Sequence, residues 1–245
     1  METKDSDYVY KNVIQLNETD ASRKFIANVF LWMFIALGIS AFCAYAFANT
    51  PSLLALLVNS SSGQLALTPL AYVAMFSPLA FILLIRFGLN RISYPILTLL
   101  FVAYAAVTGV SLSFILLIYT STSVFLVFAI SSVVFGTMAI AGYTTTMDLT
   151  NFGSIMIMLL IGVIVASLVN FFIHSSALYY IISYVGIAVF TGLTAYDVQK
   201  LKNIGAGLEY GDASAKKMAL MGGLTLYLDF VNLFLMILRL FGRRR

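Results

Sequence analysis

Seven long stretches of predominantly apolar residues account for most of this chain. An α-helix of roughly 20 apolar residues is long enough to cross the hydrocarbon core of a bilayer. Only 10% of the 245 residues are charged, whereas a soluble domain carries about 25%. We therefore predict an all-α polytopic membrane protein with seven transmembrane helices, at residues 25–48, 67–87, 92–119, 124–143, 152–173, 177–198 and 218–241.

The distribution of Lys and Arg predicts how these helices are oriented. Basic residues lie before the first span, between the second and third spans and between the sixth and seventh, whereas the loops after spans one, three and five contain none. Cytoplasmic loops are enriched in Lys and Arg. We therefore expect residues 1–22, which are polar and lack the pattern of a secretory signal, to form a cytosolic N-terminal tail, followed by a transmembrane domain at 23–245.

One feature conflicts with this topology. Seven crossings place the C-terminus outside, yet the chain ends in three arginines at positions 243–245. Either the last span crosses against the charge rule or it re-enters and returns to the cytosolic side. We favour a full crossing because earlier helices usually dominate topology.

Several classes of function are excluded by residues that the chain lacks. With one cysteine, Cys43, and one histidine, His174, it cannot form an internal disulfide or a Cys/His zinc site. It also lacks HExxH, GxSxG and phosphate-loop motifs. Its basic residues lie at helix ends, which argues against nucleic-acid binding. We expect no enzymatic activity and no cofactor. Asp148, in the turn before the fifth span, is expected to cap that span.

Four charged residues lie within or at the edge of the predicted spans, where an ionisable group costs at least about 2.5–3.5 kcal/mol; they are Arg86, Asp197, Asp229 and Arg239. Such a residue needs a partner, a water-filled cavity or a function. Two structural interpretations remain open. Asp229 can form a buried ion pair with an arginine, and Asp197 can be a solvated residue paired with Lys200 or Lys202.

The seventh predicted span carries small and polar residues on one helical stripe, formed by Gly222, Thr225, Asp229 and Asn232. We expect this stripe to face other helices or water, which makes the C-terminal helix central in the bundle. On the sixth span, Thr194 shares a face with Asp197.

A functional hypothesis pairs Asp197 with Asp229. The sixth and seventh spans are joined by a short polar loop, so they are expected to be antiparallel neighbours. Two carboxyl groups in one dry site cannot both ionise cheaply, so they would share a proton and titrate as a pair. When both are deprotonated they offer transient oxygen ligands for Ca²⁺. Thr194, Thr225 and Asn232 are candidates for the polar path of the ion.

Two motifs resemble the signature of the Bax inhibitor family, also called the transmembrane Bax inhibitor motif family. They are GLTAYDVQKLK at 192–202 and LTLYLDFVNLFLMILRLFG at 224–242; GYTTTMDLT at 142–150 is similar to a third family segment. The resemblance covers residues 25–242. It implies a seven-helix bundle in which six helices surround the last one. It also implies a pH-sensitive calcium leak in which Asp197 and Asp229 share a proton.

The resemblance also implies a role for arginines. An arginine at the end of the second span would latch onto the acidic pair, and Arg86 or Arg91 matches that position. Arg239 matches a family arginine of the last helix. The chain departs from the family pattern in two places. Residues 67–85 contain no acid, which bacterial relatives can carry, and a threonine replaces a common basic residue in GYTTTMDLT.

We expect from these features a passive, proton-gated Ca²⁺ leak channel in a bacterial inner membrane. Its partners would be the lipid bilayer, Ca²⁺ and protons, and the protein would be a monomer or weak oligomer. The alternative is a non-conducting regulator that binds other membrane proteins, in control of a membrane protease or of cell death and stress, and docks through residues 1–22. A third candidate function is proton-coupled exchange, which would move protons in a fixed ratio to Ca²⁺.

Overall fold

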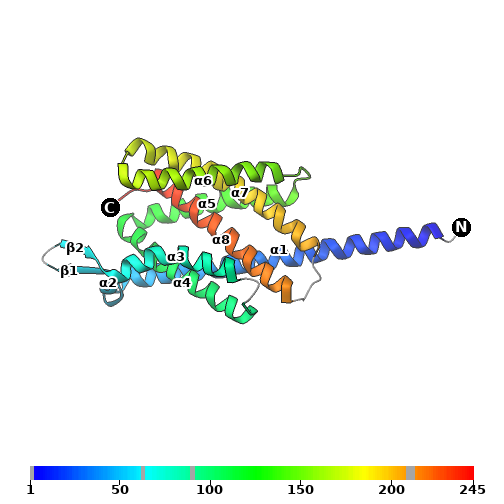
Figure 1. The fold of residues 1–245 in the computed structure, drawn as a ribbon, viewed down its shortest axis with the longest axis horizontal. Coiled ribbons are helices and arrows are strands. Elements are labelled where there is room, and N and C mark those ends of the chain that lie inside the picture. The colour runs from blue at the N-terminus through cyan, green and yellow to red at the C-terminus, as the bar shows by residue number, and fades with distance from the viewer. Residues whose placement is uncertain (1–2, 62–63, 89–91, 208–212) are drawn as a thin grey trace. The chain divides into compact units, whose positions relative to one another are not determined.

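The computed structural model describes the backbone of residues 3–61, 64–88, 92–207 and 213–245, and side chains from residue 20 onward at most of these positions. The described chain is helical apart from one small hairpin (Figure 1). Its helices are α1 (Thr3–Asn49), α2 (Pro51–Leu57), α3 (Pro69–Gly88), α4 (Tyr94–Ile118), α5 (Ser121–Thr144), α6 (Thr150–Ile173), α7 (Ser176–Ala206) and α8 (Ala213–Phe241).

A helix occupies each of the seven predicted spans. Six of these helices, among the described residues, are long and apolar enough to cross a membrane. The six do not include α3, so its crossing stays a prediction. The all-α polytopic architecture is therefore confirmed, and a count of seven crossings is not.

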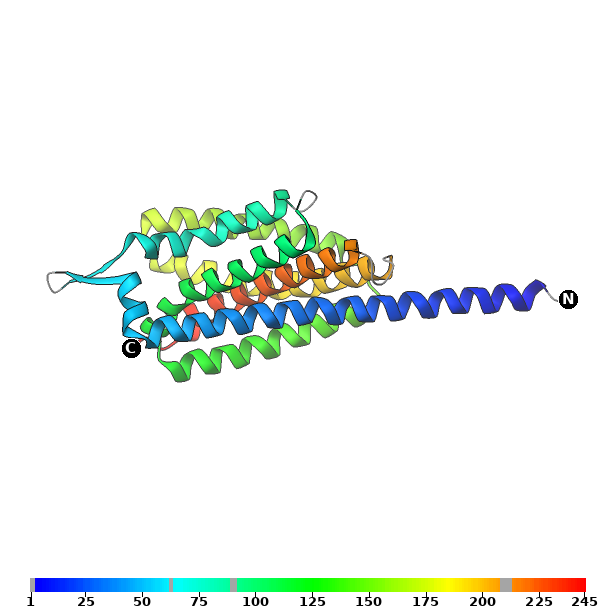
Figure 2. The same ribbon diagram turned by 90° about the horizontal axis from the view of Figure 1, so that it is seen from below.

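Two segments outside the predicted spans contain regular structure that the prediction did not include. Helix α1 starts at Thr3, so the predicted tail continues the first span as one helix; residues 3–22 contain no Pro or Gly to interrupt it. The loop predicted after the first span contains α2 and an antiparallel hairpin of β1 (Val58–Ser61) and β2 (Gln64–Leu67) (Figure 2). The Thr68 hydroxyl closes this segment by donating to the Leu56 carbonyl at 2.6 Å.

The chain divides into two compact units. The first contains residues 1–32 and 132–233, and the second contains residues 33–131 and 234–245. In the first unit α6 and α7 run side by side (Figure 1); in the second, α3 packs on α4. Among the six candidate spans α8 is the most enclosed, with 61% of its apolar window buried, against 6% for α6. The value for α8 is typical of an inner helix, and the value for α6 is typical of a lipid-facing helix.

Within the second unit, the C-terminal residues bind the turn between α4 and α5. The backbone N–H of Thr120 donates to the Arg243 carbonyl at 3.0 Å, and that of Arg245 donates to the Ile118 carbonyl at 2.9 Å. The chain end therefore lies beside this turn. Four helices, α5 to α8, separate the two points, and four single crossings return a chain to the same side of a membrane. The contact is compatible with a last helix that crosses fully, which stays a prediction.

Candidate functional site

The two predicted acids, Asp197 of α7 and Asp229 of α8, meet within the first unit. Asp229 is 5% exposed, and a side-chain hydrogen bond joins it to Asp197. Carboxylates only accept hydrogen bonds, so a bond between two carboxyl groups requires a proton on one of them. The structure therefore brings together the two groups that the sequence pairs.

One oxygen of this pair is unsatisfied. Asp229 Oδ2 is buried and has no hydrogen-bond partner among the described residues. A buried polar atom without a partner costs about 1–3 kcal/mol. The described residues contain no group of three or more His, Cys, Asp or Glu side chains suited to a metal.

The three side chains predicted to form a polar path satisfy their donors within their own helices. Thr194, Thr225 and Asn232 each donate to the backbone carbonyl four residues earlier, at 2.7, 3.1 and 2.8 Å respectively. Their oxygens retain capacity to accept further hydrogen bonds. Thr194 is fully buried. A role for these side chains in ion passage stays a prediction.

Both lysines considered as partners for Asp197 contact tyrosines. Lys202 Nζ donates to the Tyr143 carbonyl at 2.8 Å and stands 5.1 Å from the centroid of that tyrosine's ring. Lys200 Nζ lies 5.7 Å from the ring centroid of Tyr196. A basic group over an aromatic face is attracted by the ring quadrupole. These contacts lie at the end of α7 that is predicted to be cytosolic.

The structure describes the three arginines assigned to gating in different detail. The backbone of Arg86 lies in α3, but its side chain is outside the described part of the structure, and Arg91 lies wholly outside it. Arg239 lies in the last turn of α8 and is half-buried. Their role as a latch or counter-ion stays a prediction.

The segment of α7 around Asp197 is held by close approaches that sequence reasoning missed. Gly142 of α5 lies against the backbone carbonyl of Ala195, and Gly153 of α6 lies against the ring of Tyr196. A Cβ atom at either glycine would overlap these neighbours. Small residues allow this kind of close helix packing in membrane proteins. Two glycines that flank the turn at 145–149 are the sequence signal for this close packing. The prediction treated the segment only as a polar turn.

The α5–α6 turn is also bound to α7 by hydrogen bonds. Gln199 Oε1 accepts from the backbone N–H of Leu149 at 2.8 Å, and Gln199 Nε2 donates to the Met147 carbonyl at 2.7 Å. Asp148 was predicted to cap this helix, but the N-cap residue is Leu149. Asp148 lies one residue earlier and accepts from the backbone N–H of Thr150 at 2.9 Å. Hydrogen bonds from Thr150 hold the pKa of Asp148 below its usual range. The turn therefore positions the helix that carries Asp197.

Comparison with protein families agrees with the motifs that carry this site. The sequence model for the family described as "Inhibitor of apoptosis-promoting Bax1" matches residues 22–245. The chain belongs to the Bax inhibitor family. The resemblance inferred from the motifs around Asp197 and Asp229 is thereby confirmed.

Bax inhibitor family relatives cover nearly the whole chain. The inner membrane protein YbhL of Escherichia coli (strain K12) is 41% identical over 222 residues, which are 90% of this chain and 92% of YbhL. A protein of Borreliella burgdorferi is 43% identical, over 91% and 93% of the two chains. A membrane protein of Streptococcus pyogenes serotype M3 is 35% identical, over 95% and 98%. The chain is an integral membrane protein similar to a bacterial inner membrane protein.

Proposed function

We propose that this Bax inhibitor family protein is a passive, pH-sensitive calcium leak in a bacterial inner membrane, gated by Asp197 and Asp229. The observation that carries the proposal is the side-chain hydrogen bond between these two acids on α7 and α8. Because the bond needs a proton, the state of the pair depends on pH. The protein has no catalytic step in this proposal.

The proton controls whether the two helices attract or repel. With one proton bound, the carboxyl groups hydrogen-bond and hold α7 against α8, which closes the path. When that proton leaves, two negative charges remain in contact in a region of low dielectric constant, where their repulsion is many times larger than in water. Separation of the carboxylates, or entry of a cation between them, relieves this repulsion.

The chemistry of the pair suits a Ca²⁺ ion in transit. Calcium prefers oxygen ligands and takes 6–8 of them. Two carboxylates attract the ion, and the buried oxygen of Asp229 is without another partner among the described residues. Two acidic ligands do not complete a calcium shell, so water or backbone carbonyls must supply the rest. Such a site binds the ion weakly enough to release it.

The length of α1 favours a second candidate, a non-conducting regulator of other membrane proteins. Helix α1 has 47 residues, which extend about 70 Å at 1.5 Å per residue. The hydrocarbon core is about 30 Å thick, so a large part of the helix projects beyond it. In this candidate function, the projecting part of α1 docks onto another membrane protein. The Asp pair then controls whether that protein is bound.

Calcium uptake by dye-loaded liposomes distinguishes the two candidates. We expect wild-type protein to admit Ca²⁺ at a rate that rises in a sigmoid between pH 5 and pH 8, above the rate of protein-free liposomes. Deletion of residues 1–19 should leave this leak intact. Wild-type protein that admits no Ca²⁺ at any pH would contradict the channel and favour the regulator. Proton movement in fixed ratio to Ca²⁺ would identify an exchanger.

A further inference from the structure

Three consecutive arginines, Arg243, Arg244 and Arg245, are exposed where the chain leaves α8. The fold holds their backbone against the α4–α5 turn of the second unit. Arg244 forms an antiparallel bridge with Tyr119, and the backbone N–H of Arg243 donates to Ser123 Oγ at 2.9 Å. The three guanidinium groups are therefore attached to an extended segment whose position is fixed by hydrogen bonds.

The turn that holds this segment lies at a membrane surface. It joins α4 to α5, which are both long and apolar enough to cross a membrane, and only residues 119 and 120 separate the two helices. Helix α4 has 25 residues, or about 38 Å at 1.5 Å per residue, and the hydrocarbon core is about 30 Å thick. The turn and the arginines bound to it therefore lie just outside the hydrocarbon, at the level of the phospholipid headgroups.

Exposed apolar side chains of the second unit adjoin the turn and the arginines in sequence. Ile118 at the end of α4 is 50% exposed, Phe125 near the start of α5 is 75% exposed, and Phe241 at the end of α8 is 66% exposed. On helices that cross a membrane, such side chains face the acyl chains of lipids, as on the apolar surface of any membrane protein. Lipids that contact these ends of the helices bring their phosphate groups to the level of the arginines.

The second unit offers these arginines no acidic side chain. Residues 33–131 and 234–245 contain six arginines and no Asp or Glu. The guanidinium group of arginine forms paired hydrogen bonds with phosphate, because the planar fork of its donors matches the phosphate oxygens. A phosphate group at the membrane surface therefore complements this segment in both charge and geometry.

We propose that Arg243, Arg244 and Arg245 bind the phosphate groups of anionic phospholipids beside the α4–α5 turn. Successive side chains of an extended segment point to opposite sides, so Arg243 and Arg245 share one side and can bind the same headgroup. Arg245 Nη2 lies 3.5 Å from Ser121 Oγ, which places this guanidinium group at the start of α5. The proposal does not depend on the calcium leak, because it involves neither acid of the Asp pair.

Lipid titration of the purified full-length protein, read by native mass spectrometry, tests this proposal. Wild-type protein should bind phosphatidylglycerol in preference to phosphatidylcholine. The triple variant Arg243→Gln, Arg244→Gln, Arg245→Gln should bind phosphatidylglycerol about a hundredfold more weakly, since each surface arginine contributes about 1 kcal/mol, or about fivefold, to anionic lipid binding. Replacement of all three by lysine should cause a smaller loss, because lysine keeps the charge without the paired hydrogen bonds.

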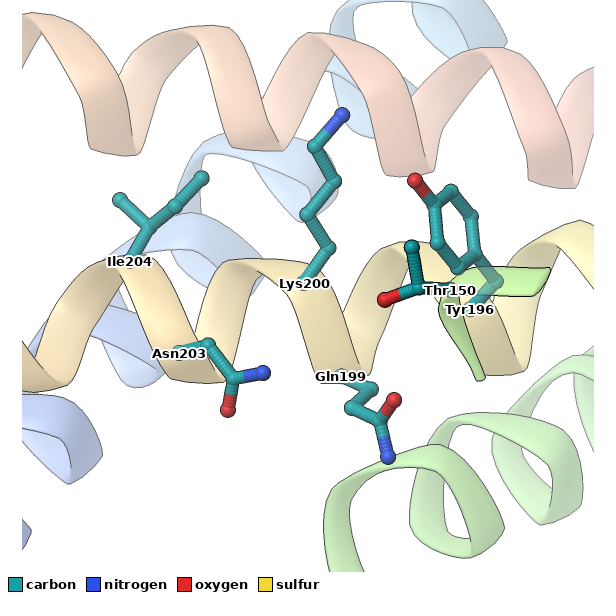
Figure 3. Close-up of a pocket in the computed structure, with 6 residues that line it drawn as sticks. All are labelled: Thr150, Tyr196, Gln199, Lys200, Asn203 and Ile204. Carbon is teal, nitrogen blue, oxygen red and sulfur yellow. The ribbon is translucent and has the colours of Figure 1, made fainter. Parts of the chain in front are cut away.

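A matched control removes the same charge from the first unit. Arg23 of α1, Lys200 of α7 and Lys216 of α8 are exposed, and Figure 3 shows Lys200 extending from α7 beside a pocket of that unit. Replacement of these three residues by glutamine should preserve the tightest phosphatidylglycerol binding, and thermal unfolding should show that every variant folds.

Three outcomes would overturn the proposal. Equal binding of phosphatidylcholine would show that the headgroup charge is not recognised. Equal losses in the arginine variant and the control variant would show general attraction to positive charge. Displacement of the lipid by inorganic phosphate would identify a small-anion site instead of a lipid site.

Discussion

Gly142→Ala should destabilise the folded protein, although alanine is the better helix former by about 1 kcal/mol. The added methyl group would overlap the backbone carbonyl of Ala195, and a backbone atom cannot rotate away as a side chain can. Separation of α5 from α7 should cost about 1–3 kcal/mol, as in other overpacked interiors. Because Ala195 lies two residues before Asp197, the pH response of the leak should also weaken.

Thermal unfolding followed with a thiol-reactive dye measures this effect, because Cys43 is the only cysteine in the chain and is half-buried. Gly162→Ala is the matched control. Gly162 lies on α6, and a Cβ atom there meets nothing within 4 Å, so this substitution should preserve or slightly raise the unfolding temperature. If Gly142→Ala melts at or above the wild-type temperature, α5 and α7 are not packed as closely as described.

Asp229→Asn should remove a loss of stability that wild-type protein shows as pH rises. The hydrogen-bonded pair holds a proton in the folded state, whereas two solvated aspartates of an unfolded chain hold none near neutral pH. Stability falls with rising pH wherever the folded state binds more protons than the unfolded state, by at most about 1.4 kcal/mol per pH unit for one proton. An asparagine at position 229 keeps a donor for Asp197 without a titrating proton.

Unfolding temperatures measured from pH 5 to pH 8, the range in which the leak is expected to titrate, should therefore decline for wild type and stay nearly flat for Asp229→Asn. Asp148→Asn is the control because Asp148 lies outside the spans. Its pKa is lowered in the folded state, so its contribution is present above the unfolded pKa and is lost as pH falls through the folded pKa. This control should change only the acid range. A decline between pH 5 and pH 8 that persists in Asp229→Asn would mean that the pair does not hold the proton.

The spans and the acidic pair were predictable from the sequence because both follow from the cost of polar groups in lipid. Helices coincide with all seven predicted apolar stretches, and Asp229 stands out because it shares one stripe with small and polar residues. The contact of Asp148 with the first turn of α6 was predictable in kind, since a carboxylate before a helix binds free backbone N–H groups, but the N-cap position belongs to Leu149.

Axial register and close packing were not predictable in the same way. Helical periodicity places Asp229 on a stripe with Thr225 and Asn232, yet Asp229 is buried while Thr225 and Asn232 are only half-buried. Periodicity also does not tell how far α8 is shifted along α7. That shift depends on contacts between distant residues, such as Gly222 of α8, where a Cβ atom would come within 2.7 Å of Leu201 and 3.0 Å of Val29. The hairpin at 58–67 was missed because neither of its strands, VNSS and QLAL, alternates strictly between apolar and polar residues.

The most direct test of the account is Ca²⁺ influx into liposomes across pH 5 to 8 for Asp197→Asn and Asp229→Asn, beside wild type and Asp148→Asn. If Asp197 and Asp229 share a proton, either single substitution by asparagine should flatten the pH dependence of the leak. The double variant should change it no further. Asp148→Asn should retain the wild-type profile. If both pair variants keep the wild-type pH profile, the aspartate pair does not gate the leak.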